Sequence, residues 1–460
     1  MRLVFLVVAM LALVPAWAQA QMRVPDSRAE ITTGFVPVVR KAAPAVVNIY
    51  ARRVVNVRSP FSDDPFFQDL FRDFGTSRKR VENSLGSGVI LGDDGFVVSN
   101  YHVVGGATDI RIVLNDRREF SARVLLADEE SDLAVLRMQG ARDMPALDLR
   151  DSDTVQVGEL VLAIGNPFGV GQTVSSGIVS GLARSGTATG NARGYFIQTD
   201  APINPGNSGG ALVDVTGRLI GINTAILSRS GGSNGIGFAI PSALVAQFVK
   251  QARAGNTSFE RPWAGVDGQP VTADMAEGLG LDRPGGVVVS QMHPQSPFRA
   301  AGIATGDVIT RVDGHPVNTL AEMMFRMSVA GIGTKARVTR FRGGGRDRVG
   351  VAMIAAPDTP PRAPVTTGRG SAIPGMRLAT VNPAVIAEYG LPLSTRGAVV
   401  EDPGRIGQRA GLRKGDVLRA INEVPVEDTR AAQSLLTDAR RRLALEVQRG
   451  GRRLSMRFRL

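Results

Sequence analysis

The sequence predicts a mainly β protein, with one large β-rich region followed by two copies of a smaller domain. Residues 35–250 contain short apolar runs between turn signals, such as PAVVNIYA, SGVILGDDGFVVSN and LVLAIGNP, a pattern typical of an all-β sandwich or barrel. Asp93-Asp94-Gly95 predicts a turn between two of these runs, because Gly tolerates positive φ. Pro241-Ser242 followed by ALVAQFVKQARAG predicts a closing helix that ends at Gly255.

The second observation is a repeat in the C-terminal half. AGIATGDVITRVDGHPV begins at Ala301 and AGLRKGDVLRAINEVPV begins at Ala410, so the two segments lie 109 positions apart. Two copies of such a unit indicate a pair of small domains rather than a solenoid. Residues 357–371, PDTPPRAPVTTGRGS, are rich in Pro, Thr and Gly without apolar periodicity, so we expect an extended linker there.

The N-terminus predicts export. Arg2 precedes the apolar run of residues 3–14, and Ala18-Gln19-Ala20 follows as a small-residue cleavage site. These features are typical of a secretory signal peptide removed after Ala20. The run is short for a membrane span, which needs about 20 residues, but an uncleaved anchor is the alternative.

The amino-acid composition excludes several classes of protein and several kinds of site. The chain has 460 residues, 43% of them apolar and 21% charged, which excludes a mainly disordered chain and a multi-span membrane protein. Cysteine is absent, so disulfides, cysteine–zinc sites, iron–sulfur clusters and thiol nucleophiles are excluded. Of the three histidines, His293 and His315 lie in turn contexts and are given no catalytic role, which leaves His102. We expect no metal and no organic cofactor.

The net charge of +12 comes largely from arginines in the C-terminal half, many of them in residues 440–460. Nucleic acid is not the expected partner, because an exported protein rarely meets it. The alternation in LSMRFRL predicts a strand with solvated arginines on one face. Peripheral contact with anionic membranes or acidic substrates is the alternative.

Gly206-Asn207-Ser208-Gly209-Gly210 is the sharpest motif. A nucleophilic serine needs a tight turn that exposes its Oγ, together with backbone N–H groups that converge on a developing oxyanion. Glycines on both sides of Ser208 permit both, and we expect the N–H groups of Gly206 and Ser208 to form the oxyanion hole. The alternative is an ordinary β-turn.

Two further residues complete a catalytic constellation. His102 follows an apparent strand in VVSNYHVV, and Asp132 opens the apolar strand SDLAVL. Taken singly, they could be a structural histidine and a turn cap. The order His102, Asp132, Ser208 is the chymotrypsin-type order, which predicts Ser208 as nucleophile, His102 as general base and acid, and Asp132 as the group that orients the imidazole.

The segments SNYHVV, SDLAVL, TDAPINPGNSGGALV, IGINTAIL and IGFAIP occur in an order that resembles the HtrA family of serine endoproteases, or peptidase Do, in its DegP/DegQ form with two PDZ domains. The short segment 60–75, which lacks cysteines, makes the resemblance more DegQ-like. The resemblance implies a chymotrypsin-like double β-barrel protease domain followed by two PDZ domains. It also implies an ATP-independent periplasmic endopeptidase that degrades misfolded or unfolded exported proteins, binds C-terminal peptides through its PDZ domains, and assembles into homotrimers and larger oligomers. The expected limits are signal peptide 1–20, N-terminal segment 21–34, protease domain 35–255, first PDZ domain 262–355, linker 356–372 and second PDZ domain 373–460.

The resemblance implies further site residues. Thr224-Ala225-Ile226-Leu227 resembles the strand that pairs with extended substrate and walls a pocket for small aliphatic side chains, alongside residues 206–208. Residues 182–195 resemble the regulatory loop, with Arg184 as its sensor residue. Trp263-Ala264-Gly265-Val266 resembles the carboxylate-binding loop of the first PDZ domain, and the nearest counterpart in the second repeat is Ile373-Pro374-Gly375-Met376.

Two other features bear on regulation. Asn207 is neutral, so activation by an ion pair with a freshly cleaved N-terminus is not expected, and ordering of loops is the predicted switch. Segment 60–75, PFSDDPFFQDLFRDFG, has aromatic residues at helical spacing. It is either a surface helix or an inter-subunit latch that resembles the family's inhibitory loop.

Two other function classes stay open at this point. One is a PDZ-based periplasmic chaperone whose protease activity is secondary. The other is a signalling protease that cuts one membrane partner, although such proteins usually carry one PDZ domain and a retained anchor.

Overall fold

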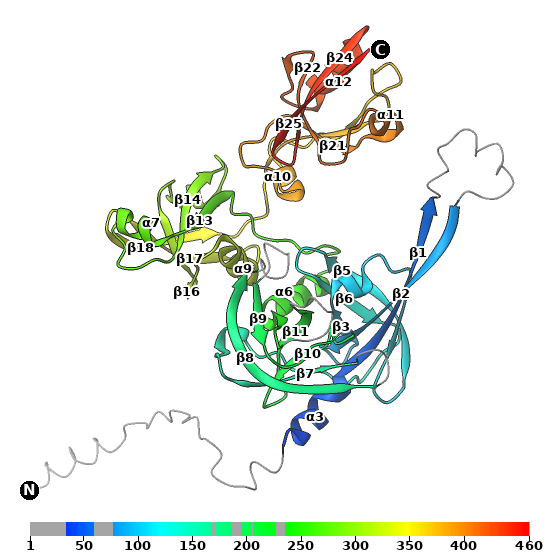
Figure 1. The fold of residues 1–460 in the computed structure, drawn as a ribbon, viewed down its shortest axis with the longest axis vertical. Coiled ribbons are helices and arrows are strands. Elements are labelled where there is room, and N and C mark those ends of the chain that lie inside the picture. Colours follow the sequence, from blue (N-terminus) through cyan, green and yellow to red (C-terminus); the bar gives the residue numbers. More distant parts are fainter. Residues whose placement is uncertain are drawn as a thin grey trace, which may run out of the picture.

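The computed structural model describes residues 34–58, 77–166, 171–185, 195–204, 206–226 and 235–459. The predicted signal peptide and the aromatic segment 60–75 lie outside the described residues. Figure 1 shows a domain of two β-barrels, the first of the two predicted PDZ domains beside it, and the second predicted PDZ domain, which carries the C-terminus.

The first barrel follows a short N-terminal helix, α3 (Val36–Ala42), and the single 3₁₀ turn η1 (Ala43–Ala45). Six strands close it in the order β1-β2-β3-β6-β5-β4. The strands and the intervening helix are β1 (Val46–Arg58), β2 (Ser77–Ile90), β3 (Phe96–Ser99), α5 (Tyr101–Val104), β4 (Asp109–Val113), β5 (Glu119–Asp128) and β6 (Leu133–Met138). The turn predicted before β3 is confirmed, since Gly95 has φ +83°.

The second barrel also has six strands, closed in the order β10-β11-β12-β9-β8-β7. Its elements are η2 (Ser152–Thr154), β7 (Leu160–Gly165), β8 (Thr173–Ser185), β9 (Tyr195–Thr199), β10 (Ala211–Asp214), β11 (Leu219–Ile226), β12 (Gly237–Pro241) and the closing helix α6 (Ser242–Arg253). Gly255 follows α6 with φ +91°, which confirms the predicted helix end. The two barrels confirm the predicted chymotrypsin-like fold.

Helix α6 belongs to the core rather than the surface. It packs against strands of both barrels, including β6 and β11, and Phe248 on its inner face is fully buried. The ring of Phe248 stacks on that of Phe259 with centroids 4.0 Å apart. The apolar side chains of β3 and β6 are buried along nearly their whole length, so these strands show continuous apolar runs rather than alternation.

The first PDZ domain is a sheet in the order β13-β14-β15-β17-β18, with β16 paired to β15. Its elements are β13 (Val266–Pro270), α7 (Ala273–Leu279), β14 (Val287–Met292), α8 (Pro297–Ala300), β15 (Val308–Val312), β16 (His315–Pro316), α9 (Leu320–Ala330), β17 (Lys335–Arg342) and β18 (Gly345–Ala352).

The second PDZ domain repeats this order and adds one strand at the edge of its sheet. Its elements are β19 (Val365–Thr366), β20 (Arg377–Thr380), α10 (Pro383–Tyr389), β21 (Ala398–Asp402), α11 (Gly404–Arg409), β22 (Val417–Ile421), β23 (Val424–Pro425), α12 (Thr429–Asp438), β24 (Arg442–Arg449) and β25 (Arg452–Arg459). The sequence repeat is confirmed, and one ion pair recurs in both copies. Asp307 pairs with Arg342 in the first copy, and Asp416 pairs with Arg449 in the second.

The stretch predicted as an extended linker differs from that expectation. Residues 365 and 366 form β19, which pairs antiparallel with β20. A free strand edge presents unpaired N–H and C=O groups. Here residues 365 and 366 of the same chain provide hydrogen-bonding partners for the edge of β20. The sequence showed that this stretch lacks apolar periodicity, but it did not indicate this strand pairing.

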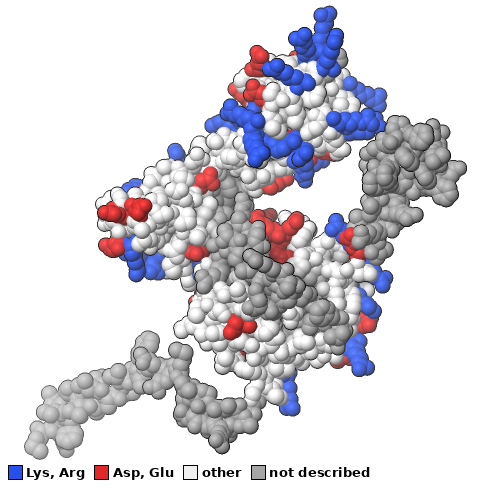
Figure 2. Space-filling view, viewed as in Figure 1, with Lys and Arg blue, Asp and Glu red and all other residues white. Residues whose placement is uncertain are grey.

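The C-terminal arginines lie as predicted. Along β25 the side chains alternate between exposed and half-buried, with Arg453, Arg457 and Arg459 on the exposed face. Figure 2 shows Lys and Arg gathered over this end of the molecule. Among the described residues, the helices are all too short or too polar to cross a membrane.

Candidate active site

His102 and Asp132 meet at the end of the first barrel. Helix α5 begins directly after β3 and carries His102, while Asp132 occupies the turn between β5 and β6. His102 Nδ1 lies 2.9 Å from both carboxylate oxygens of Asp132, and the backbone N–H of His102 donates to Oδ1 over 3.0 Å. A carboxylate only accepts, so Nδ1 carries a proton, and in the neutral imidazole it is then Nε2 that keeps its lone pair.

Asp132 is held in this position from several sides. Its φ of +52° places it in the left-handed region, which Asp tolerates better than most residues. The side-chain amide of Asn100 donates to its backbone carbonyl over 2.9 Å. The carboxylate is therefore oriented by backbone geometry as well as by its partners.

Thr224 joins Asp132 to the second barrel. Its hydroxyl donates to Asp132 Oδ2 over 2.5 Å. The pairing of β11 with β12 shifts register between Asn223 and Ala225, so Thr224 sits at a β-bulge. Bulges redirect side chains next to active sites, and this one directs the Thr224 side chain across the junction between the two barrels. The sequence placed Thr224 on a substrate-binding strand but did not indicate this contact.

Ser208 lies on the tight turn that the glycines permit. Gly209 has φ +84°, and a Cβ there would lie 2.1 Å from the carbonyl oxygen of Ser87. A Cβ at Gly210 would lie 2.2 Å from the carbonyl oxygen of Ile164. Both positions therefore exclude any side chain, which is the physical reason for two consecutive glycines after the serine.

The hydroxyl of Ser208 points to Thr224 rather than to His102. It donates to the carbonyl oxygen of Thr224 over 3.0 Å, and among the described residues it makes no hydrogen bond to the imidazole. The structure thus brings all three residues to the junction between the barrels, where Asp132 and Ser208 both contact Thr224, with His102 and Asp132 paired and Ser208 in a different hydrogen bond.

Ser87 on β2 braces the turn from the first barrel. Its hydroxyl donates to the carbonyl oxygen of Gly206 over 2.7 Å, and its N–H donates to that of Ser208 over 2.8 Å. The hydroxyl also accepts from the N–H of Asn166 over 2.9 Å. Sequence reasoning missed Ser87; the only local signal is its position between two glycines in LGSGV.

The N–H groups predicted for an oxyanion hole are uncommitted within the described part of the chain. The N–H of Asn207 donates to the carbonyl oxygen of Asn204 over 2.9 Å, whereas those of Gly206 and Ser208 donate to no described residue. The side chain of Asn207 is buried and accepts from Thr173 Oγ1 over 3.4 Å. Within the described ranges, no group of three or more His, Asp or Glu side chains gathers to hold a metal ion.

Several predicted residues are placed only in part. Ala225 and Ile226 continue β11, and Leu227 lies outside the described residues. Arg184 lies on β8 opposite Phe196 of β9, but residues 186–194 of the predicted regulatory loop are outside the described ranges.

The predicted carboxylate loop of the first PDZ domain leads into the edge strand β13, whose first residue is Val266. Gly265 has φ +58°, and its Cβ would meet the ring of Trp263 at 2.7 Å. Trp263 is buried and packs edge-on against His293 with centroids 5.3 Å apart. Burial lowers the pKa of His293, and Arg396 lowers it further.

The first PDZ domain is docked on the protease domain through α9. Arg326 forms an ion pair with Asp153, and its guanidinium donates to the hydroxyl of Tyr195 over 3.0 Å. Phe325 stacks on the ring of Tyr195, with centroids 3.9 Å apart. His315 Nε2 lies 3.4 Å from the same Asp153 carboxylate. Tyr195 is the last residue of the predicted regulatory loop, so this contact reaches the end of that loop.

Comparisons with known proteins agree with this architecture. Residues 86–222 match the family described as a trypsin-like peptidase domain, and residues 248–353 and 398–449 match PDZ domain families. The chain is 35% identical to the periplasmic serine endoprotease DegP of Escherichia coli strain K12, over 96% of this chain and 95% of that protein. It is 36% identical to the periplasmic pH-dependent serine endoprotease DegQ of the same strain, over 90% of this chain and 89% of that protein.

A solved structure of the HtrA-type protease AlgW with a tripeptide is 38% identical, with a TM-score of 0.54, and covers 70% of this chain and 97% of that one. A probable periplasmic serine protease of Haemophilus influenzae, described as do/HhoA-like, is 36% identical over 94% of this chain and 92% of that protein. With its double barrel and two PDZ domains, the chain belongs to the HtrA family of periplasmic serine endoproteases and is itself a serine endopeptidase.

Proposed function

We propose that Ser208, His102 and Asp132 are the catalytic residues of this endopeptidase. The observation that carries the proposal is the contact of His102 Nδ1 with both oxygens of Asp132 at 2.9 Å. In the neutral imidazole this contact makes Nε2 the unprotonated nitrogen, which can accept the proton of Ser208. Ser208 attacks the peptide carbonyl to form an acyl-enzyme, His102 protonates the leaving amine, and water then releases the acid.

The hydrogen bond from Ser208 to Thr224 means that the starting geometry is a resting state, in which the nucleophile is not yet bonded to the general base. A rotation about the Cα–Cβ bond of Ser208 transfers its hydroxyl from the carbonyl of Thr224 toward His102. The bond given up is a single neutral hydrogen bond, worth about 1 kcal/mol net. Substrate binding is sufficient to offset a cost of this size.

The oxyanion hole is formed by the N–H groups of Gly206 and Ser208. Preorganised donors of this kind act on the charge that develops on the substrate oxygen. The substrate backbone extends along residues 224–227, with its side chain before the cut in a pocket that favours small aliphatic groups. Arg184 acts as the sensor of the regulatory loop.

The substrates are misfolded or unfolded exported proteins, cut without ATP in the periplasm after removal of signal peptide 1–20. The loop of residues 263–266 receives C-terminal peptides, because it leads directly into β13, the edge strand of this sheet. The chain works as a homotrimer or larger oligomer.

The test is cleavage of reduced casein by the full chain and by Ser208→Ala. Removal of the nucleophile is expected to lower turnover by at least about 10⁴-fold, because triad members act as a unit. Ser121→Ala is the matched control, since Ser121 is exposed on β5, and it is expected to cleave like the unaltered chain. Equal cleavage by Ser208→Ala would contradict the assignment, and suppression of aggregation without any cleavage would favour the chaperone alternative.

A further inference from the structure

The two PDZ domains build the same peptide groove from the same elements. In the first, the groove lies between β13 and α9; in the second, its counterparts are β20 and α12. Each strand is preceded by a glycine in the left-handed region, Gly265 with φ +58° and Gly375 with φ +76°. A PDZ groove adds an extended peptide to this strand edge, with the end of the peptide at the preceding loop.

The chain enters the two domains by different routes. Before the first domain, Phe259 stacks on Phe248 of the protease domain, and Arg261 forms an ion pair with Asp128. This segment is held away from β13, which is the last strand on its side of the sheet. Before the second domain, the chain instead forms β19 along the outer edge of β20.

Strand β19 has the direction of a PDZ ligand. It pairs antiparallel with β20, with Val365 opposite Leu378 and Thr366 opposite Arg377. The N–H of Thr380 donates to the carbonyl oxygen of Arg362 over 2.7 Å, which extends the pairing toward the other end of β20. The segment therefore runs along the whole strand toward the loop that contains Gly375.

The end of the segment occupies the carboxylate loop. The N–H of Gly375 donates to the carbonyl oxygen of Thr367 over 2.9 Å, and the N–H of Met376 donates to Thr367 Oγ1, also over 2.9 Å. Thr367 is 3% exposed. In the first domain, by contrast, the N–H of Gly265 donates to no residue that the structure describes.

Helix α12 lies along the other side of residues 363–367. The hydroxyl of Thr429, the first residue of α12, donates to the carbonyl oxygen of Ala363 over 2.8 Å and lies 3.2 Å from that of Thr380 on β20. Val365 packs against the apolar core of the domain. Residues 363–367 therefore lie between the strand and the helix, where an added peptide strand would lie.

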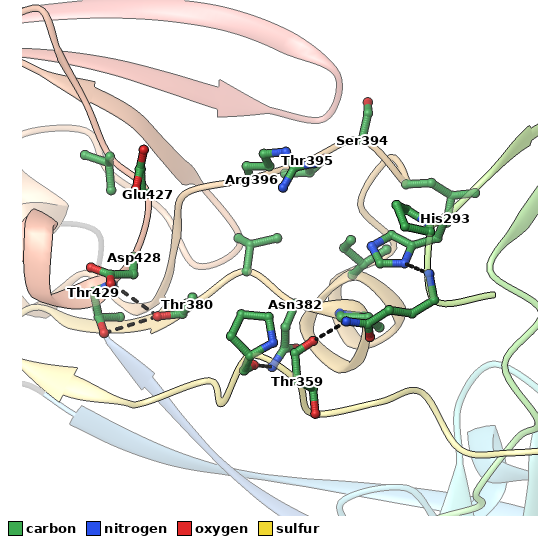
Figure 3. A pocket seen from close by; sticks show the side chains of 18 of the residues that line it. His293, Thr359, Thr380, Asn382, Ser394, Thr395, Arg396, Glu427, Asp428 and Thr429 are labelled. Carbon is green, nitrogen blue, oxygen red and sulfur yellow. Dashed lines mark hydrogen bonds between the residues drawn. The ribbon is translucent and has the colours of Figure 1, made fainter.

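The segment also borders open space. A cleft of about 1500 Å³ between the two PDZ domains is lined by Ala363, Pro364 and Val365 on the linker and by Thr429 and Gln433 on α12. Figure 3 shows the cleft with Thr380 and Thr429 at one end and His293 of the first domain at the other. There is room beside the groove for the segment to leave it.

We propose that residues 363–367, Ala-Pro-Val-Thr-Thr, are a tethered ligand that fills the peptide groove of the second PDZ domain. An external C-terminal peptide enters this groove only by displacing the segment, whereas no strand of the described residues pairs with the outer edge of β13 in the first domain. A tethered ligand acts at an effective concentration of the order of millimolar, so peptides that bind weakly are excluded from the second domain.

The probe is the pentapeptide Ala-Pro-Val-Thr-Thr with a free C-terminal carboxylate and a photoreactive group at its N-terminus. It has the side chains of the tethered segment, and its carboxylate can accept from the N–H of Gly375. Crosslinks to the full chain are mapped by mass spectrometry, which separates the two domains. Binding is titrated to give an apparent affinity for each.

Thr367→Pro removes the N–H that donates to the carbonyl oxygen of Met376 and the hydroxyl that the loop holds. It is expected to tighten binding of the probe to β20 and α12 by at least about 10-fold. Thr366→Ala is the matched control, because Thr366 is exposed and contributes only its backbone. It is expected to behave like the unaltered chain.

A second opened variant replaces residues 363–367 with Gly-Ser-Gly-Ser-Gly and is expected to give the same crosslinks. Its folding and that of Thr367→Pro are checked by the thermal transition of the second domain. The proposal fails if the unaltered chain already binds the probe at the second domain as tightly as the opened variants. It also fails if both opened variants are folded and give no crosslink there.

Discussion

The hydroxyl of Thr224 donates a hydrogen bond of 2.5 Å to Oδ2 of Asp132. The two residues belong to different barrels and lie 92 positions apart in the chain. The bond gives Oδ2 a second partner besides His102 Nδ1, while the carbonyl of the same threonine accepts from Ser208. One bulged residue of β11 thus contacts two of the three proposed catalytic residues.

Thr224→Val is expected to lower kcat by about 10-fold, because it removes one hydrogen bond to a charged group, worth about 1.5 kcal/mol, without changing side-chain volume. The measurement is steady-state cleavage of a chromogenic peptide across a pH series. Binding of substrate should change less than kcat.

Thr224→Ser keeps the hydroxyl and serves as the control. It is expected to retain most of the activity. If Thr224→Val is as active as the unaltered chain at every pH, the hydroxyl has no part in orienting Asp132.

Gly209→Ala is expected to abolish activity and to lower the melting temperature of the protease domain. The added Cβ would lie 2.1 Å from the carbonyl oxygen of Ser87, at a residue with φ +84°. The turn must therefore open before the side chain fits. Casein cleavage and differential scanning calorimetry measure the two effects.

Gly158→Ala is the control that separates backbone strain from a steric clash, because Gly158 has φ +96° with no atom near its Cβ position. It carries only the cost of a left-handed alanine, about 1 kcal/mol, and is expected to stay active. Equal damage in the two variants would show that close packing around Gly209 is not the cause.

Arg326→Ala is expected to loosen the first PDZ domain from the protease domain. It removes the ion pair with Asp153 and the hydrogen bond to Tyr195, and Arg326 itself is only 10% exposed. Loss of one charged hydrogen bond, about 1.5 kcal/mol, corresponds to about a 10-fold faster amide exchange by local opening. Hydrogen exchange of α9 and of the start of β9 is the measurement.

Arg299→Ala on the exposed surface of α8 is the comparison and should leave exchange in α9 unchanged. Unaltered protection of α9 in Arg326→Ala would mean that the stacking of Phe325 on Tyr195 is sufficient for docking.

Asp307 gives the first PDZ domain a predictable dependence on pH. Burial alone would raise the pKa of Asp307, but the hydrogen bonds from Arg342 and from the N–H of Ala304 outweigh it and hold the pKa below its usual value. A carboxyl whose pKa is lowered on folding stabilises the folded state above its unfolded pKa of about 3.9. That contribution is lost as the pH falls through the folded pKa.

The melting temperature of Asp307→Asn is therefore expected to lie below that of the unaltered chain at pH 7, with a gap that narrows below about pH 4. Differential scanning fluorimetry of both chains across pH gives this gap directly. Asp282→Asn, at an exposed loop position, should show none. A gap that is constant from pH 7 to pH 3 would exclude the ion pair as its source.

Much of the architecture follows from local patterns in the chain. Helix α6, the turn before β3, the repeated domain and the exposed arginines of β25 were all predicted, because each depends on residues that are neighbours along one element. The segments around His102, Asp132 and Ser208 were recognised for a similar reason, since each is a short motif whose residue types are set by its own chemistry.

What the sequence by itself determined is thus the order of the elements, the two kinds of domain and the residues that are candidates for catalysis. Only the tertiary structure decided that Thr224 bonds to Asp132, that Ser87 braces the turn of Ser208, and that residues 363–367 fill the groove of the second PDZ domain. These contacts join segments through strand edges and bulges, and a free edge can pair with any chain that reaches it. Which segment does so depends on the route by which the chain enters the domain, and that route differs between β13 and β20.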